Sequence, residues 1–231
     1  SWQHPFWQDV LKNGEKSAYF DWFCGVSMEV LRGKTSKELT ADVMRGEKPF
    51  ESFAFAADMP KWNTENPAVQ DYLIGTAAEW TRKYGVDAWR LDVPDEVSFR
   101  FLEHFKKRIR ETNPEAYIIG EIWQKSTAWL RAGVFDGAMD YPLYFAIRDF
   151  AMKRTDGVET FAERIKDVFL SAPDCVRPRQ LAFCGNHDIP RPLTVCGGDT
   201  DRLAAALFLQ MLLGGAMSIY YGDELGMSGV E

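Results

Sequence analysis

Cysteine and histidine are scarce in this chain, and neither occurs in a pattern typical of metal ligands. The 231 residues include four cysteines and three histidines. The cysteines show no Cys-x-x-Cys spacing and no dense disulfide pattern, which argues against a zinc site and a disulfide scaffold. We therefore assign no residue as a metal ligand, and we expect thiols in a reducing, cytoplasmic compartment at Cys24, Cys175, Cys184 and Cys196.

Long apolar runs and clustered positive charge are missing as well. No apolar run reaches transmembrane length, and no signal peptide is visible at a start that reads as the middle of a larger protein. The formal net charge is -7, which argues against nucleic acid or an anionic membrane as a partner. Hydrophobic residues make up 46% and aromatic residues 14% of the chain, enough for a packed core.

Clear periodicity is absent from residues 1 to about 60. Aromatic residues alternate there with polar residues and turn formers, and only Phe50, Phe53 and Phe55 alternate as a short strand would. An irregular stretch of this length in a compact domain is usually a functional insertion. We therefore predict a loop-rich insertion over residues 1–62 and a separate folded region over residues 63–231.

Helices and strands alternate after residue 66. Asn66 and Pro67 predict the start of a helix and Gly85 its end. We expect its inner stripe to hold Val69, Tyr72, Leu73, Thr76, Ala77, Trp80 and Tyr84. We predict strands over 86–93, 116–121, 134–139, 181–185 and 216–221, and further helices over 95–111, 126–131, within 142–171 and over 200–213. The 95–111 helix is expected to bury Phe99, Leu102, Phe105 and Ile109.

Five strand–helix repeats with apolar strands favour an α/β fold with a parallel sheet covered by helices. An open doubly wound sheet and a closed eight-stranded (β/α)8 TIM barrel both fit this pattern. No strand–helix junction carries a Gly-rich dinucleotide fingerprint, which counts against the open sheet. Acidic residues follow several strands, at Asp92, Glu121, Asp188 and the Asp223-Glu224 pair, as in a barrel rim. Since a barrel needs eight strands, we expect a partial barrel.

The segment Gly85–Val93 is the most informative strand. Its alternation puts Arg90 and Asp92 on one face of a strand that we expect to be buried. Such charges are costly to bury unless they are paired. One interpretation is a structural ion pair. The other is a functional carboxylate at a strand end, which the adjacent arginine keeps ionised.

Acids on separate strand ends suggest glycoside hydrolysis. A retaining glycosidase needs a carboxylate nucleophile and a carboxylic acid roughly 5 Å apart, and adjacent strand ends are about 5 Å apart. Asp92 suits the role of the nucleophile, because Arg90 beside it would keep its carboxylate ionised. Glu121, beside the apolar Ile122 and Trp123, is expected to have a raised pKa and to act as the acid. Unrelated surface acids are the alternative interpretation.

Four segments resemble the alpha-amylase superfamily, family 13 of the glycoside hydrolases. They are Gly85-Val86-Asp87-Ala88-Trp89-Arg90-Leu91-Asp92-Val93, Ile119-Gly120-Glu121-Ile122-Trp123, Gly185-Asn186-His187-Asp188-Ile189-Pro190-Arg191 and Ile219-Tyr220-Tyr221-Gly222-Asp223-Glu224-Leu225-Gly226-Met227. Met59-Pro60-Lys61-Trp62-Asn63 is similar to a motif of the neopullulanase, cyclomaltodextrinase and maltogenic amylase branch, although Trp62 replaces the usual Leu. Asp95-Glu96 stands where that branch has Asn-Glu beside the acceptor subsites.

The resemblance implies roles for nine residues. Asp92 would be the nucleophile, Glu121 the general acid and base, and Asp188 the third carboxylate. Substrate binding would involve Arg90, which orients Asp92, together with His187, Trp123, Asp95, Glu96 and Arg191. No cofactor would be required for the chemistry, and a structural calcium would be compatible with the resemblance but is not readable from the sequence. The chain would contain strands four to eight of the barrel, without the family's first motif.

Three functions remain open at this point. The first is hydrolysis of α-1,4-glucosidic bonds in cyclomaltodextrins, maltooligosaccharides, or pullulan and starch. The second is α-glucan transglycosylation at the same site, and the third is sugar binding without catalysis. A metal-dependent phosphohydrolase could also use a His-Asp pair, but three histidines provide no second cluster. We expect an α-glucan oligosaccharide as substrate, and the remainder of the catalytic domain or a second copy as protein partner.

Overall fold

A computed structural model of the protein describes residues 2–31, 33–47, 49–54 and 56–230. The chain divides into two compact units. The first unit comprises Ser1–Val86 and Asp95–Pro114, and the second comprises Asp87–Pro94 and Glu115–Glu231. The predicted boundary between an insertion over 1–62 and the remaining chain stays a prediction.

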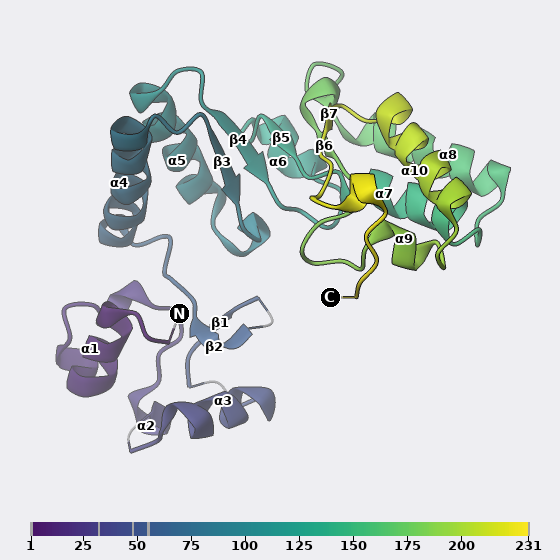
Figure 1. The fold of residues 1–231 in the computed structure, drawn as a ribbon. Coiled ribbons are helices and arrows are strands. Elements are labelled where there is room, and N and C mark those ends of the chain that lie inside the picture. The colour runs from purple at the N-terminus through teal and green to yellow at the C-terminus, as the bar shows by residue number, and fades with distance from the viewer. Residues whose placement is uncertain (1, 32, 48, 55, 231) are drawn as a thin grey trace. The chain divides into compact units, whose positions relative to one another are not determined.

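Aromatic side chains form the core of the N-terminal part of the first unit. This part contains α1 (Pro5–Asn13), α2 (Met28–Leu31), α3 (Ser36–Met44) and an antiparallel hairpin of β1 (Ser52–Phe53) and β2 (Ala56–Pro60) (Figure 1). The rings of Trp7 and Phe50 are buried 5.2 Å apart. The strand expected from Phe50, Phe53 and Phe55 is limited to β1, and Phe55 lies outside the described residues.

The expectation that residues 1–60 lack regular structure is wrong for α1 and α3, which have nine residues each. Both helices begin with local signals that the periodicity does not reveal. His4 caps α1 by accepting from the Phe6 amide, and Pro5 follows as the first helical residue. Thr35 and Glu38 form a capping box at the start of α3. Capping of this kind lets a short helix form with few apolar positions.

Two packed helices complete the first unit. α4 (Pro67–Tyr84) begins after Asn66 and ends at the left-handed Gly85, as predicted. Its buried face, which packs on α5 (Phe99–Thr112), differs from the expected stripe and consists of Val69, Gln70, Ile74, Ala77, Ala78 and Thr81. Trp80 and Tyr84 are exposed. In α5, Leu102, Phe105 and Ile109 are buried as predicted, whereas Phe99 is exposed.

Five parallel strands form the second unit's sheet. β3 (Ala88–Leu91), β4 (Tyr117–Gly120) and β5 (Gly137–Ala138) pair in that order, and β6 (Leu181–Ala182) pairs with β7 (Ala216–Met217) (Figure 1). A parallel bridge between Met139 and Leu181 connects the two groups. All five predicted strands are therefore present, although each is shorter than predicted. Among the described residues β3 and β7 do not pair, so the sheet is open.

The prediction that the Gly85–Val93 strand is buried is wrong for this structure. The residues of β3 are half-buried or exposed, because β3 is an edge strand that pairs only with β4 among the described residues. By contrast, Ile118 and Ile119 in β4 are buried. Burial therefore follows the position of each strand in the sheet rather than its apolar sequence.

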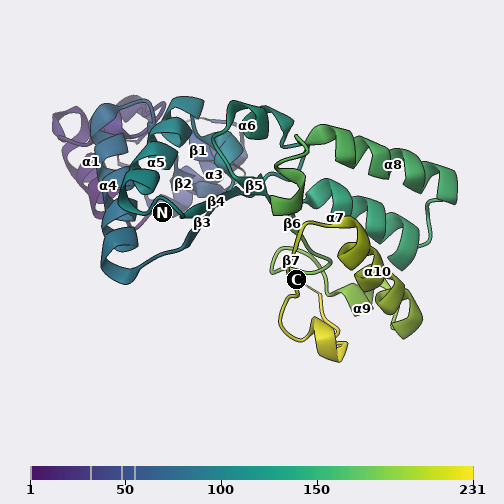
Figure 2. The ribbon, with the colours of Figure 1, turned by 90° about the horizontal axis from the view of Figure 1, so that it is seen from above.

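Helices pack beside the strands of the second unit. They are α6 (Thr127–Ala132), α7 (Tyr141–Ile147) with its π-helical extension Arg148–Met152, α8 (Val158–Ser171), α9 (Pro192–Val195) and α10 (Thr200–Leu213). Figure 2 shows α7 beside α8 and α10. Their shared core includes Leu143, Ile147, Val168 and Leu203. Among the described residues, no helix combines the length and apolar content needed to cross a bilayer.

Candidate active site

Two of the predicted acids follow neighbouring strands at the same edge of the second unit's sheet. Asp92 follows Leu91, the last residue of β3, and Glu121 follows Gly120, the last residue of β4. Leu91 and Gly120 are register partners, and the Glu121 amide donates to the Leu91 carbonyl over 3.0 Å. The parallel register therefore brings both acids to adjacent positions, where strands lie about 4.8 Å apart.

One guanidinium group contacts all three predicted acids. Arg90 Nη1 pairs with Asp92 Oδ1, while Arg90 Nη2 lies 2.9 Å from Glu121 Oε1 and 4.0 Å from Asp188 Oδ2. Asp188 comes from the segment after β6, far along the chain from the other two. The structure therefore brings Asp92, Glu121 and Asp188 together around one positive charge.

Glu121 is the most enclosed of the three acids. Its side chain is 4% exposed, compared with 67% for Asp92 and 31% for Asp188. Trp123 lies beside this carboxyl as expected, and the carboxyl oxygens also accept hydrogen bonds. In addition to the ion pair with Arg90, Oε1 accepts from Trp123 Nε1 at 3.2 Å and Tyr141 Oη at 3.4 Å, and Oε2 accepts from the Val93 amide at 3.2 Å.

The backbone turn after Asp92 directs one of these donors. Val93 has a φ of 41°, a left-handed conformation that is strained for a β-branched residue. This conformation accompanies the bond from the Val93 amide to Glu121. The chain therefore adopts an unfavourable backbone angle directly beside the candidate nucleophile.

Asp188 lies in a tight turn. Its amide donates to Asn186 Oδ1 over 2.8 Å, and its carboxylate lies 3.4 Å from His187 Nε2. His187 is largely exposed, so its ring can reach a ligand. Gly185 begins the turn, and a Cβ there would overlap the Asp223 carboxylate.

Arg191 has an environment of its own. Its Nη1 donates to Asp223 Oδ1 over 2.9 Å, and the guanidinium lies over the rings of Tyr220 and Tyr221. These contacts already hold the head group in place. The predicted role of Arg191 in sugar binding stays a prediction.

The predicted acceptor-side residues belong to the first unit. Glu96 pairs with Lys61 over 2.8 Å, and Asp95 is exposed in the 3-10 turn Pro94–Glu96. Trp62, which departs from the family motif, stacks on Phe23 with ring centroids 4.8 Å apart. The aromatic core therefore provides a packing reason for the larger side chain at this position.

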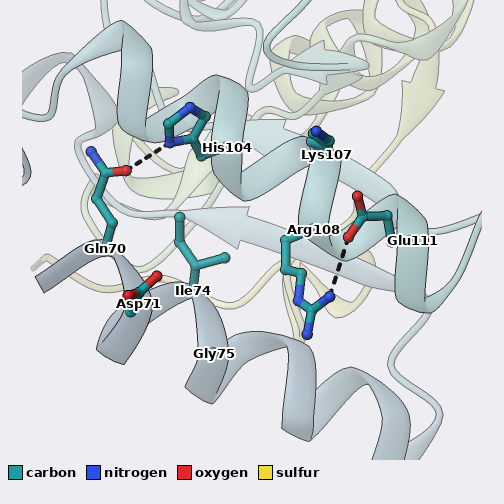
Figure 3. Close-up of a pocket in the computed structure, with 8 residues that line it drawn as sticks. All are labelled: Gln70, Asp71, Ile74, Gly75, His104, Lys107, Arg108 and Glu111. Atoms are coloured by element: carbon teal, nitrogen blue, oxygen red, sulfur yellow. Dashed lines mark hydrogen bonds and ion pairs between the residues drawn. The ribbon is translucent and has the colours of Figure 1, made fainter. Parts of the chain in front are cut away.

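A groove in the first unit lies between α4 and α5. It has a volume of about 410 Å³ and is lined by Gln70, Asp71, Ile74, Gly75, His104, Lys107, Arg108 and Glu111 (Figure 3). His104 and Gln70 bond each other, as do Arg108 and Glu111. None of the predicted site residues lines this groove. Within the described part of the chain, no group of three or more His, Cys, Asp or Glu residues could hold a metal ion.

Two residues at the site were not predicted, Tyr141 and Asn186. Asn186 Nδ2 donates to Tyr141 Oη over 3.1 Å, and Tyr141 Oη lies beside Glu121. Tyr141 directly follows Asp140 after β5. The rule that polar residues gather after strands, applied to this third strand as well, would have indicated it.

Comparisons with known proteins identify the family of the chain. The family profile described as "Alpha amylase, catalytic domain" matches residues 1–231. The chain belongs to the alpha-amylase family. The expected α/β fold, part of a (β/α)8 barrel, is thereby confirmed.

Similar members of the alpha-amylase family are much longer than this chain. It is 39% identical over 225 residues to a cyclomaltodextrinase of Geobacillus thermopakistaniensis (strain MAS1), covering 97% of this chain and 36% of that protein. It is 35% identical over 225 residues to an intracellular maltogenic amylase of Bacillus subtilis (strain 168), with coverage of 97% and 36%. A solved cyclomaltodextrinase structure has a TM-score of 0.87 at 37% identity, covering 98% of this chain and 37% of that one.

Proposed function

We propose that the protein is a retaining glycoside hydrolase that cleaves α-1,4-glucosidic bonds in cyclomaltodextrins, maltooligosaccharides or pullulan. The observation that carries the proposal is the contact of Arg90 with Asp92, Glu121 and Asp188. Acids on neighbouring strands, about 5 Å apart, suit the retaining geometry. The family, and the cyclomaltodextrinase and maltogenic amylase names of its relatives, support the substrate class.

In the first step, an Asp92 oxygen attacks the anomeric carbon as the bond to the leaving sugar oxygen breaks. Glu121 transfers its proton to that oxygen, which leaves as a hydroxyl, and a covalent glycosyl ester forms on Asp92. In the second step, Glu121 takes a proton from water, whose oxygen displaces Asp92. Two displacements retain the anomeric configuration.

The other residues would position the sugar. Arg90 pairs with Asp92 and orients it as the nucleophile. Asp188 would hold sugar hydroxyls, with His187 beside it, and Trp123 offers an aromatic edge next to Glu121. We assign Asp95, Glu96 and Arg191 to substrate contacts through the family resemblance alone. The chemistry proposed for these residues requires no cofactor.

The test compares Asp92→Asn with Asp87→Asn in the protein encoded by the complete gene. Asp92 and Asp87 flank the same strand, and Asp87 is exposed before its amino end. Turnover of β-cyclodextrin and maltotriose should fall at least about 10⁴-fold in Asp92→Asn, because the nucleophile is lost. Asp87→Asn should keep normal turnover. Near-normal activity of the Asp92→Asn variant would exclude Asp92 as the nucleophile.

Product analysis separates the alternatives. NMR of the first products should show the α-anomer, whereas a β-anomer would contradict retention. Oligosaccharides longer than maltotriose, formed from maltotriose, would identify a transglycosylase with the same site. Binding of maltotriose without any turnover would identify a sugar-binding protein.

We also propose a cytoplasmic location and a protein partner. The location is supported by the relative named intracellular maltogenic amylase and by four free cysteines. The partner would be the remainder of the catalytic domain or a second copy, because the sheet is open in the described residues. Immunoblotting of fractionated source cells would test the location.

A further inference from the structure

The Tyr141 ring is fixed by packing. It is the first residue of α7, and its side chain is completely buried. The ring stacks on Trp123, with centroids 4.3 Å apart and planes at 17°, and meets Phe183 edge-on at 4.9 Å. A ring held on two sides has little rotational freedom, so the position of its hydroxyl is determined by the core.

The direction of the hydrogen bonds at this hydroxyl follows from its neighbours. The Asp188 amide can only donate, so Asn186 must present Oδ1 to it and turn Nδ2 toward Tyr141. Tyr141 Oη therefore accepts from Asn186 Nδ2 and is free to donate its own proton to Glu121 Oε1. Burial raises the pKa of Tyr141, so the phenol stays protonated and remains a donor.

The two oxygens of Glu121 are consequently unequal. Oε1 accepts from Trp123 and Tyr141, which occupy its two lone pairs, and it also forms the ion pair with Arg90. Oε2 accepts only the Val93 amide among the described hydrogen bonds. A proton on the carboxyl group is therefore better accommodated on Oε2 than on Oε1.

We infer that Tyr141 is a positioning residue that holds Glu121 so that Oε2 carries the transferable proton, and that it connects Glu121 to the turn of Asp188 through Asn186. This inference rests on the proposed function. When the Oε2 proton moves to the leaving oxygen, the new carboxylate keeps both hydrogen-bond donors and the Arg90 ion pair on Oε1. Tyr141 itself exchanges no proton with the substrate.

The test uses Tyr141→Phe, with Tyr144→Phe as a matched control, in the protein encoded by the complete gene. Both tyrosines are buried in α7, and Tyr144 stacks on Phe183 while its hydroxyl interacts with Arg148. The two substrates are maltotriose, whose leaving oxygen needs a proton, and α-maltosyl fluoride, whose fluoride leaves with little protonation.

Tyr141→Phe should lower kcat/KM for maltotriose about 10- to 100-fold, as expected for a lost hydrogen bond to a charged group. The same variant should lower kcat/KM for α-maltosyl fluoride less than about threefold, because fluoride leaves with little protonation. Tyr144→Phe should affect both substrates by less than about threefold. The inference would be overturned if Tyr141→Phe lowered kcat/KM equally for both substrates, or if its kcat/KM values matched those of Tyr144→Phe. A wild-type protein that cleaves neither substrate would instead refute the proposed function.

A double-mutant cycle gives a second measurement. Because Tyr141 acts through Glu121, Tyr141→Phe should cause less than about a threefold further loss on α-maltosyl fluoride in a Glu121→Ala background. A large additional loss there would show a general packing role and contradict the inference. Circular dichroism of each variant checks that the fold is kept.

Discussion

Gly185 shows how closely single residues are fitted around the candidate site. The Asp223 carboxylate occupies the space where a side chain at residue 185 would begin, and Arg191 holds that carboxylate over 2.9 Å. Asp223 and Arg191 lie on the segments that follow β7 and β6. A close approach of this kind requires glycine, because any Cβ would displace a buried ion pair.

We expect Gly185→Ala to lower the free energy of unfolding by about 1–3 kcal/mol, as overpacking does, and to reduce turnover by moving the Asp188 turn. Gly75→Ala is the control, since no atom lies within 4 Å of a Cβ at that helical position. It should be neutral or raise stability by up to about 1 kcal/mol. Denaturant unfolding of both variants measures the difference; equal effects would contradict the close fit.

Some residues of the candidate site could be predicted from the sequence and others could not. Asp92, Glu121, Asp188 and Arg90 were all identified as one cluster, because each acid follows a predicted strand and parallel strands end at one edge. Tyr141 and Asn186 were missed. Their contribution depends on where a hydroxyl and an amide point in three dimensions, which neither periodicity nor spacing encodes.

At the scale of elements, the start of α7 carries a buried charge. Asp140 caps this helix by accepting from the Leu143 amide, and burial raises its pKa to about 6 even though that bond lowers it. The folded state therefore binds the proton more tightly than the unfolded state does. The stability that this provides is present in full below about pH 4 and is lost as the pH rises through about 6.

Asp140→Asn should remove this dependence. Asparagine keeps the cap but carries no charge, so the variant should exceed the wild type by about 1–3 kcal/mol at pH 7, with a smaller difference at pH 4. Asp199, the half-buried cap of α10, gives the opposite case, because backbone hydrogen bonds from Arg202 and Asp201 lower its pKa. Urea unfolding at pH 4 and pH 7 should therefore show no gain in the free energy of unfolding at pH 7 for Asp199→Asn. A similar gain at pH 7 in Asp140→Asn and Asp199→Asn would contradict the burial argument.

Elements differ in how well the sequence could predict them. The bounds of α4 and α10 were predicted correctly, because each has clear end signals and a long periodic body. The buried stripe of α4 was not, since Trp80 and Tyr84 lie on its exposed face. Periodicity identifies apolar positions, but tertiary contacts decide which of them are covered in this chain.

At the scale of the whole molecule, the open sheet and one exposed apolar helix face both favour self-association. β3 is an edge strand, and α10 exposes Phe208, Met211 and Leu212 on one side. Unpaired strand edges and exposed apolar faces promote association. We expect the 231-residue chain alone to self-associate at concentrations of about 10 μM and above.

Phe208→Glu with Leu212→Glu should reduce this association and leave the circular dichroism spectrum unchanged. Lys166→Glu on the exposed part of α8 is a charge control that should change association much less. Light scattering over a dilution series measures the effect. A wild-type chain that stays monomeric throughout would contradict the prediction.

Arg90 lies in β3 and Asp92 directly follows that strand, so both partners of this ion pair belong to one chain segment. If β3 were to shear against β4, the arginine and the aspartate would travel together and their mutual attraction would survive. Glu121, anchored on the neighbouring strand, would be left behind. A mis-registered sheet would keep the Arg90–Asp92 contact and lose the contact of Arg90 with Glu121, so an intact Arg90–Asp92 pair would not show that the candidate site is assembled.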